Sequence, residues 1–224
     1  MSNIIIPFRA NLLQSLGCTS NLTNDFSILF DGVDDYLNLG NGVSFEYTDS
    51  FSYSFWVNPN AVSGLKVLYA KFDASRGIYM YLSSPNPTGF NTLNFNLYNT
   101  NSGSTATRKR ITTNAGANVL PSVWTNLVIT YDGSGLGTGI NVYKNGVSET
   151  VTVTQDNLQN GTIINTQDSY LNSFNGISSF YGGGTWYRMG DLVTAFPTIP
   201  DVIGTNDGTV FNENEATMIV PDVP

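Results

Sequence analysis

The sequence contains no histidine and only one cysteine, Cys18. Without histidine, the chain lacks the commonest general base, the Ser-His and Cys-His nucleophile pairs and the usual zinc ligand. A single cysteine cannot form an intrachain disulfide. No apolar run approaches the length of a membrane span, and the first residues lack the basic region of a signal peptide. We therefore expect no histidine-based catalysis, no disulfide scaffold, no signal peptide and no membrane insertion.

Charged residues are also scarce, at 12% of the 224 residues. The formal net charge is −8 and the isoelectric point is about 4.2, which argues against nucleic acid or an anionic membrane as a partner. The basic cluster Arg108-Lys109-Arg110 departs from this trend. It has two interpretations, a solvated strand end or loop and a contact with an acidic partner.

Aromatic residues are plentiful at 12%, and they alternate with polar residues as in half-buried strands. In Phe51–Val57, for example, phenylalanine, tyrosine and valine alternate with serine and tryptophan. Asn145-Gly146 is a strong hairpin signal between two such runs. Residues 99–107 are polar and predict a loop. The expected strands are 26–30, 36–39, 51–57, 66–72, 77–82, 93–98, 124–131, 140–144 and 147–153.

The two ends of the chain are less regular than its middle. Residues 1–22 are expected to form an N-terminal arm, 23–191 a single β-domain and 192–224 an irregular C-terminal extension. The arm carries a short apolar group that is either an edge strand of the domain or a segment that docks on another chain. Its members, the expected partner contacts, are Ile4, Ile5, Ile6 and Phe8.

Four phrases follow one another in a characteristic order: FDGVDDYLNLG, FSYSFWVNP, VWTNLVITYDGSG and INVYKNGV. They begin at Phe30, Phe51, Val123 and Ile140. In this order the phrases resemble laminin-G-like, concanavalin A-like lectin domains. The resemblance implies an all-β jelly-roll sandwich of two antiparallel sheets, with irregular N- and C-terminal extensions.

The end of the chain carries a second likeness. Trp186–Asp191, Gly204–Thr209 and Ile219–Pro224 resemble the endings of laminin-G-like proteins encoded by bacteriophages. This resemblance implies a virion protein assembled in the host cytoplasm, in contact with other virion structural proteins and able to form a homo-oligomer. Trp186, Tyr187 and Met189 are expected to supply one strand to the sandwich.

The chain offers few residues for catalysis. Glycosidases on this scaffold need two carboxylates at strand spacing. Glu213 and Glu215 have that spacing, but they lie among asparagines in the irregular tail. We therefore predict that the protein is not an enzyme.

Two kinds of binding site are open to the chain. Clustered oxygen ligands suit calcium, and Asp34 and Asp35 are the candidate ligands. The alternative is that Asp31 and Asp34 make turn hydrogen bonds with their own backbone. Glycan binding needs exposed aromatic rings. Tyr79 and Tyr81 share one strand face, and Tyr98 and Tyr143 lie on other strands, but core packing is the alternative for each.

The favoured function is a non-enzymatic virion component, a displayed jelly roll that serves as capsid decoration, head fibre or tail-associated adhesin and binds host-surface glycans weakly. The alternative is a free glycan-binding lectin module, with or without calcium, that has no structural role.

Overall fold

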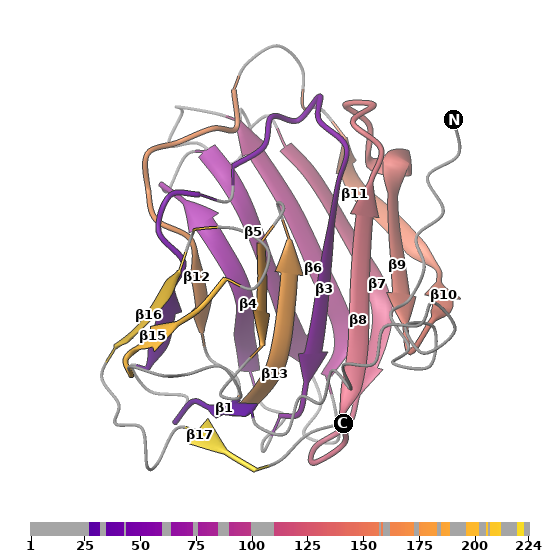
Figure 1. Ribbon diagram of the computed structural model, residues 1–224. Helices are drawn as coiled ribbons and strands as arrows, with labels where there is room; N and C mark the ends of the chain where they lie inside the picture. Colours follow the sequence, from indigo (N-terminus) through magenta and orange to yellow (C-terminus); the bar gives the residue numbers. More distant parts are fainter. Residues whose placement is uncertain are drawn as a thin grey trace, which may run out of the picture.

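The computed structural model describes residues 27–31, 35–42, 44–59, 64–73, 76–84, 90–99, 110–156, 158, 162–172, 175–182, 185–188, 196–201, 205, 207–211 and 219–221. Two antiparallel sheets stack face to face, and Figure 1 shows β3, β8 and β13 of one sheet in front of β4, β5 and β6 of the other. The all-β jelly-roll sandwich expected from the sequence is thereby confirmed. Within the described part of the chain, no helix has the length and apolarity needed to cross a membrane.

Seven strands of the eight-stranded sheet follow the order β10-β9-β8-β3-β13-β1-β17. The eighth, β14, is outside this order and pairs with β13. Its strands are β1 (Ser27–Leu29), β3 (Phe51–Val57), β8 (Thr125–Tyr131), β9 (Ile140–Lys144), β10 (Val147–Glu149), β13 (Asn175–Gly182), β14 (Thr185–Arg188) and β17 (Ile219–Val220).

The nine-stranded sheet has the order β11-β7-β6-β5-β4-β12-β2-β16-β15. Its strands are β2 (Tyr36–Asn38), β4 (Gly64–Phe72), β5 (Arg76–Ser84), β6 (Phe90–Asn99), β7 (Arg110–Val119), β11 (Val151–Asp156), β12 (Tyr170–Asn172), β15 (Thr198–Ile199) and β16 (Gly208–Phe211). A short 3-10 turn, η1 (Gly137–Gly139), precedes β9.

The core lies between the sheets because successive side chains of a strand point to opposite faces. In β3 and β8, buried and partly exposed residues alternate along the whole strand. Aromatic rings fill much of this space: Phe51, Tyr53 and Phe55 of β3 are buried, and Tyr53 packs against Tyr69 of β4 with ring centroids 4.9 Å apart. The alternation read from the sequence therefore marks the core residues of these strands.

The chain crosses from one sheet to the other between β1 and β2 and again between β10 and β11. β1 pairs with β13 and β17, whereas β2 pairs with β12 and β16, so the chain crosses from one sheet to the other between Leu29 and Tyr36. The expected strand over 147–153 is likewise two strands, because β10 pairs with β9 and β11 pairs with β7. No glycine or proline occurs within 147–153, so the sequence carries no turn signal at this second crossing.

The C-terminal segment also differs from the expectation. Within 192–224, which we expected to be an irregular extension, β15, β16 and β17 pair with the two sheets. Ile199 and Val210 are buried in the core. These strands have two to four residues, too few for a period-two pattern to be detected. The strand expected around Trp186 is present as β14.

Candidate functional site

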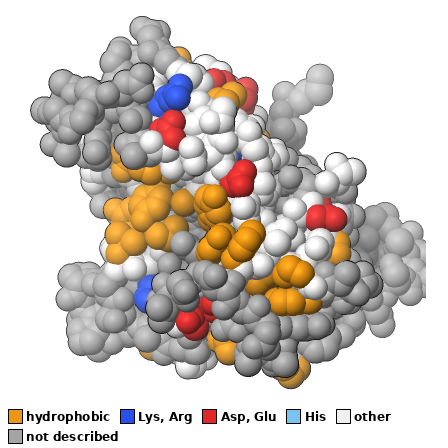
Figure 2. Space-filling view, turned by 90° about the vertical axis from the view of Figure 1, so that its left-hand side faces the viewer, with side chains coloured by type: hydrophobic (Ala, Val, Ile, Leu, Met, Phe, Trp, Pro, Cys, Tyr) orange, Lys and Arg blue, Asp and Glu red, His pale blue; other side chains and the backbone are white. Residues whose placement is uncertain are grey.

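The outward face of the nine-stranded sheet carries a concentration of aromatic side chains. In β5, Ile78, Met80 and Leu82 are buried in the core, so the intervening Tyr79 and Tyr81 point away from it and are partly exposed. Figure 2 shows hydrophobic side chains, tyrosines included, gathered in a band across the side where β12, β15 and β16 lie in Figure 1.

Four rings from three neighbouring strands form what we call the central aromatic cluster: Phe72 of β4, Tyr79 and Tyr81 of β5, and Tyr98 of β6. The ring centroids of Phe72 and Tyr98 are 5.0 Å apart, those of Tyr79 and Tyr81 are 5.3 Å apart, and those of Phe72 and Tyr79 are 6.1 Å apart. Phe72 and Tyr98 meet across β5 because the residue between them in register is Gly77, which has no side chain.

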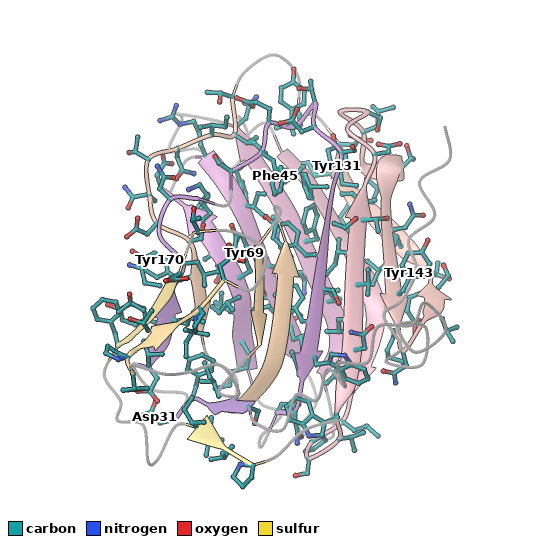
Figure 3. The ribbon with its side chains drawn as sticks, in the orientation of Figure 1. Asp31, Phe45, Tyr69, Tyr131, Tyr143 and Tyr170 are labelled. Atoms are coloured by element: carbon teal, nitrogen blue, oxygen red, sulfur yellow. The ribbon has the colours of Figure 1, made fainter. Side chains whose placement is uncertain are left out.

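Three further rings form the edge aromatic cluster: Tyr36 of β2, Tyr170 of β12 and Phe211 of β16. Tyr36 stacks on Phe211 with ring centroids 4.9 Å apart and meets Tyr170 edge-on at 5.5 Å. Phe211 keeps 38% of its surface exposed. Figure 3 shows Tyr170 at this edge of the molecule and Tyr143 of β9 at the opposite edge, so Tyr143 does not join either cluster.

The two aromatic clusters share one face of the same sheet. Tyr170 pairs with Ala70 of β4, and Ala70 pairs in turn with Tyr79. Neighbouring strands are about 4.8 Å apart, so the Tyr170 and Tyr79 backbones are separated by about 10 Å. The small side chain of Ala70 lies between the two larger ones and is partly exposed. The seven rings therefore border one surface, whose centre is Ala70.

The amides on this face hold the sheet together. Asn94 and Asn96 of β6 are 8% and 1% exposed. Asn94 Nδ2 donates to Ser83 Oγ at 2.8 Å, and Asn96 Nδ2 donates to the carbonyl oxygen of Tyr79 at 3.2 Å. These contacts hold β6 against β5, the strand that carries Tyr79 and Tyr81.

The hydroxyls of Tyr79 and Tyr170 stay neutral at physiological pH. Burial raises the pKa of Tyr79 above its ordinary value, and the neighbouring Tyr81 and Tyr98 raise it further. Burial also raises the pKa of Tyr170, with added contributions from Asp168 and Tyr36. A neutral phenol both donates and accepts a hydrogen bond. The face therefore combines apolar ring surface with uncharged hydrogen-bonding groups.

Acidic residues are almost absent from this sheet. Of its nine strands, only β11 contains a carboxylate, Asp156, and β11 lies at the edge. Asp168 lies beside Tyr170 in the connection that precedes β12, where its Oδ2 accepts from Asn38 Nδ2 at 2.9 Å. The strands beneath the aromatic clusters supply no pair of carboxylates.

The candidate calcium ligands are described in part. Asp35 is 5% exposed, and its Oδ2 accepts a hydrogen bond from the backbone N–H of Asp31 at 2.7 Å. This contact is a local hydrogen bond of the kind expected if the aspartates stabilise the turn. Asp34 lies outside the described residues, and in the described ranges no group of three or more potential metal-ligating side chains occurs. Calcium binding stays a prediction.

The expected partner-contact residues of the N-terminal arm, Ile4, Ile5, Ile6 and Phe8, lie outside the described residues. Most of the basic cluster at 108–110 lies outside them as well. So does the loop expected at 99–107, except for Asn99, which is the last residue of β6 and not a loop residue.

Sequence reasoning finds only part of the aromatic surface. Tyr79, Tyr81 and Tyr98 stand out in the sequence because they alternate with core residues on adjacent strands. Tyr36, Tyr170 and Phe211 do not, because their strands have three or four residues and are far apart in the chain. Only the pairing of β2 with β12 and β16 brings them together.

The chain matches one family model over most of the sandwich. This model, Laminin_G_3, is described as the concanavalin A-like lectin/glucanases superfamily and matches residues 31–182. No relative was found among curated proteins.

Several solved structures are similar to the chain. One is the native heptameric SAP-like pentraxin from Limulus polyphemus, with 15% identity, a TM-score of 0.46, and coverage of 71% of this chain and 76% of the pentraxin. Another is the CBM40 of the Ruminococcus gnavus IT-sialidase, with 10% identity, a TM-score of 0.39, and coverage of 63% and 77%. The binding domain of botulinum neurotoxin serotype C1 has 15% identity and a TM-score of 0.41, with coverage of 87% of this chain and 38% of the toxin domain.

Proposed function

Because the chain belongs to the concanavalin A-like lectin/glucanases superfamily, we propose that it is a non-enzymatic jelly roll that binds neutral glycans on the outward face of its nine-stranded sheet. The family expected from the four sequence phrases is confirmed by this membership. The observation that carries the proposal is the joint exposure of the central and edge aromatic clusters on one face. Exposed rings gathered in this way mark a binding surface more often than isolated ones do.

Aromatic rings recognise sugars because the C–H groups on one side of a pyranose ring form an apolar patch that packs on a ring face. The sugar hydroxyls then need neutral donors and acceptors nearby. Tyr79, Tyr81 and Tyr170 supply both properties, since each has an apolar ring and an uncharged phenol. Ala70 leaves room between Tyr79 and Tyr170, and we expect one sugar unit to lie over it.

The charge distribution favours a neutral ligand. The chain has a net charge of −8, but the strands beneath the rings contain no carboxylate. An acidic glycan would be repelled by the protein as a whole and would need a basic side chain that pairs with it. Of the basic residues next to the central cluster whose side chains the structure describes, Lys71 is buried and Arg76 is already paired with Asp73 at 3.3 Å.

The lack of carboxylates in these strands also supports a binding role and not a hydrolytic one. Glycoside hydrolases require two carboxylates about 5–10 Å apart on either side of the scissile bond. The strands β2, β12, β4, β5 and β6 contain none. The strands that hold a sugar bound over these rings would therefore offer it no pair of carboxylates to act as general acid and base.

A glycan array probed with the purified protein tests the proposal. We expect hits on neutral oligosaccharides, and we expect Tyr79→Ala and Tyr81→Ala each to weaken binding about fivefold, because a ring contact contributes about 1 kcal/mol. Tyr143→Ala is the matched control, since Tyr143 lies on the other sheet and its loss should leave the signals unchanged. Silence of the wild-type protein on the array, or equal effects of all three variants, would contradict the proposal.

A companion proposal concerns where the jelly roll works. We infer that it is a virion structural protein, displayed as capsid decoration, head fibre or tail-associated adhesin. The observation behind this inference is the resemblance of three C-terminal phrases, from Trp186 to Pro224, to the endings of phage-encoded proteins. The apolar arm at Ile4–Phe8 would then contact other virion proteins or a second copy of the chain. Ordering such an arm costs entropy, which a sizeable buried contact must offset.

Mass spectrometry of purified virions tests this role by asking whether the polypeptide is present and in how many copies. Deletion of residues 1–20 should leave the sandwich folded and remove the protein from particles. If the polypeptide is missing from virions while the glycan array gives selective hits, the protein is a free lectin module with no structural role. Full incorporation of the deletion variant would refute anchoring through the arm.

A further inference from the structure

Lys71 is a buried lysine near the end of β4. Its residue surface is 3% exposed, and its position in register is opposite Ile78, which belongs to the core. The Nζ atom contacts three oxygen atoms: the carbonyl oxygen of Gln167 at 2.8 Å, the carbonyl oxygen of Asn41 at 3.5 Å, and the side-chain Oδ1 of Asn41. The Lys71 amine therefore lies directly against the side-chain amide of Asn41.

The backbone holds these groups in place. The N–H of Leu39 donates to the carbonyl oxygen of Ser169 at 2.8 Å. The N–H of Ser169 donates in turn to the carbonyl oxygen of Gly40, also at 2.8 Å. These two bonds keep the segment of Asn41 beside the segment of Gln167. Asn165 Nδ2 donates to the carbonyl oxygen of Lys71 at 3.3 Å, which fixes the lysine backbone to the same segment.

Burial disfavours the charged form of Lys71. In the part of the chain that the structure describes, no carboxylate lies within ion-pairing distance of Nζ. Burial lowers the pKa of Lys71, and the more distant charge of Asp168 offsets this only in part. A neutral amine has two N–H groups and one lone pair. When the N–H groups donate to the carbonyl oxygens of Gln167 and Asn41, the lone pair is left for the carbon atom of the Asn41 side chain.

We propose that Lys71 and Asn41 form an intramolecular isopeptide bond. The Lys71 Nζ lone pair attacks Asn41 Cγ, a Nζ–Cγ bond forms and the Cγ–Nδ2 bond breaks. One proton passes from Nζ to Nδ2, and the leaving group departs as ammonia. The step exchanges one amide for another, so it needs no oxidant, reductant or cofactor. Asn41 is exposed, so ammonia leaves directly into solvent.

Asp168 is the group that the structure offers for the proton transfer. It is half-buried, follows Gln167 directly, acts electrostatically on Lys71 and is held by the hydrogen bond from Asn38 Nδ2. Because its carboxylate lies beyond ion-pairing distance of Nζ, it would take the proton from Nζ through one water molecule and return it to the departing nitrogen, so that Asp168 is unchanged at the end.

The bond would link β4 covalently to the segment that follows β2, and the two bonded residues are 30 positions apart in the sequence. A disulfide gives the same kind of link in other proteins by restricting the unfolded chain. This chain has a single cysteine and cannot form one internally. The inference is independent of glycan binding.

Intact-mass spectrometry of the denatured full-length wild-type protein tests the inference. We expect a mass lower than the sequence mass by one ammonia molecule, and a branched peptide joining the segments of Asn41 and Lys71 after proteolysis. Lys71→Met and Asn41→Ala should each restore the mass calculated from their sequence. Lys66→Met, on the same strand, should keep the loss of ammonia, and Asp168→Ala should slow or abolish it.

The wild-type measurement decides the question even if a variant fails to fold. A wild-type mass equal to the full sequence mass, in protein whose circular dichroism spectrum shows a folded β-sandwich, would overturn the proposal. A loss of ammonia that persists in Lys71→Met would do the same, because it would place the reaction elsewhere in the chain.

Discussion

Replacing Gly77 with alanine should destabilise the protein strongly. Gly77 has φ +123°, a backbone conformation that residues with a side chain rarely adopt. A Cβ atom there would lie 1.9 Å from the carbonyl oxygen of Lys71 and 2.6 Å from Asn165 Nδ2. The backbone strain costs about 1–3 kcal/mol. Moving Asn165 aside also breaks its hydrogen bonds to the carbonyl oxygens of Lys71 and Arg76, at about 1 kcal/mol each.

We therefore expect Gly77→Ala to lower the free energy of unfolding by about 3–5 kcal/mol, measured by urea denaturation followed by circular dichroism. Gly146→Ala is the matched control. Gly146 also has a positive φ, +80°, but a Cβ atom added there would meet no other atom within 4 Å, so the expected cost is about 1 kcal/mol. Equal costs for the two variants would refute the reasoning, because both would then reflect φ alone.

The remaining predictions concern the core, the buried tyrosines and calcium. Leu127→Ala should cost about 3 kcal/mol of unfolding free energy because Leu127 is fully buried, whereas Val147→Ala, at a residue 66% exposed, should cost almost nothing in the same urea titration. Burial raises the pKa of Tyr69 to about 12, so the stability that this hydroxyl contributes is complete below pH 10 and is lost as the pH rises from 10 to 12. The loss should reach about 2–3 kcal/mol, and unfolding titrations of Tyr69→Phe should show a smaller loss over this range. If Asp34 and Asp35 bind calcium, adding calcium to chelator-treated protein should raise its melting temperature. The Asp35→Asn variant should not show this rise. An unchanged melting temperature of the wild-type protein would end the calcium hypothesis.

Much of the fold could be read from local pattern. Alternation in Phe51–Val57 and Trp124–Tyr131 identified the strands and their buried faces, because the side-chain period of a strand is two. Asn145-Gly146 identified the hairpin of β9 and β10, and both residues have the positive φ that such a turn requires. These features depend on residues close together in the chain, so the sequence contains them directly.

The candidate site depended on pairing across long sequence separations. Tyr79 and Tyr81 could be placed on one face from alternation, but their exposure on the same surface as Tyr36, Tyr170 and Phe211 could not. The three- and four-residue strands β2, β12 and β16 have little pattern of their own, and they are positioned by their neighbours in the sheet.

The sequence by itself determined the secondary structure of the central strands, the composition of the core and the scarcity of catalytic side chains. The tertiary structure alone decided which strands share a sheet, which rings share a face, and that Lys71 meets Asn41. The physical reason is that alternation records only whether a side chain is buried. The identity of its neighbours follows from strand order, which is set by packing over the whole chain.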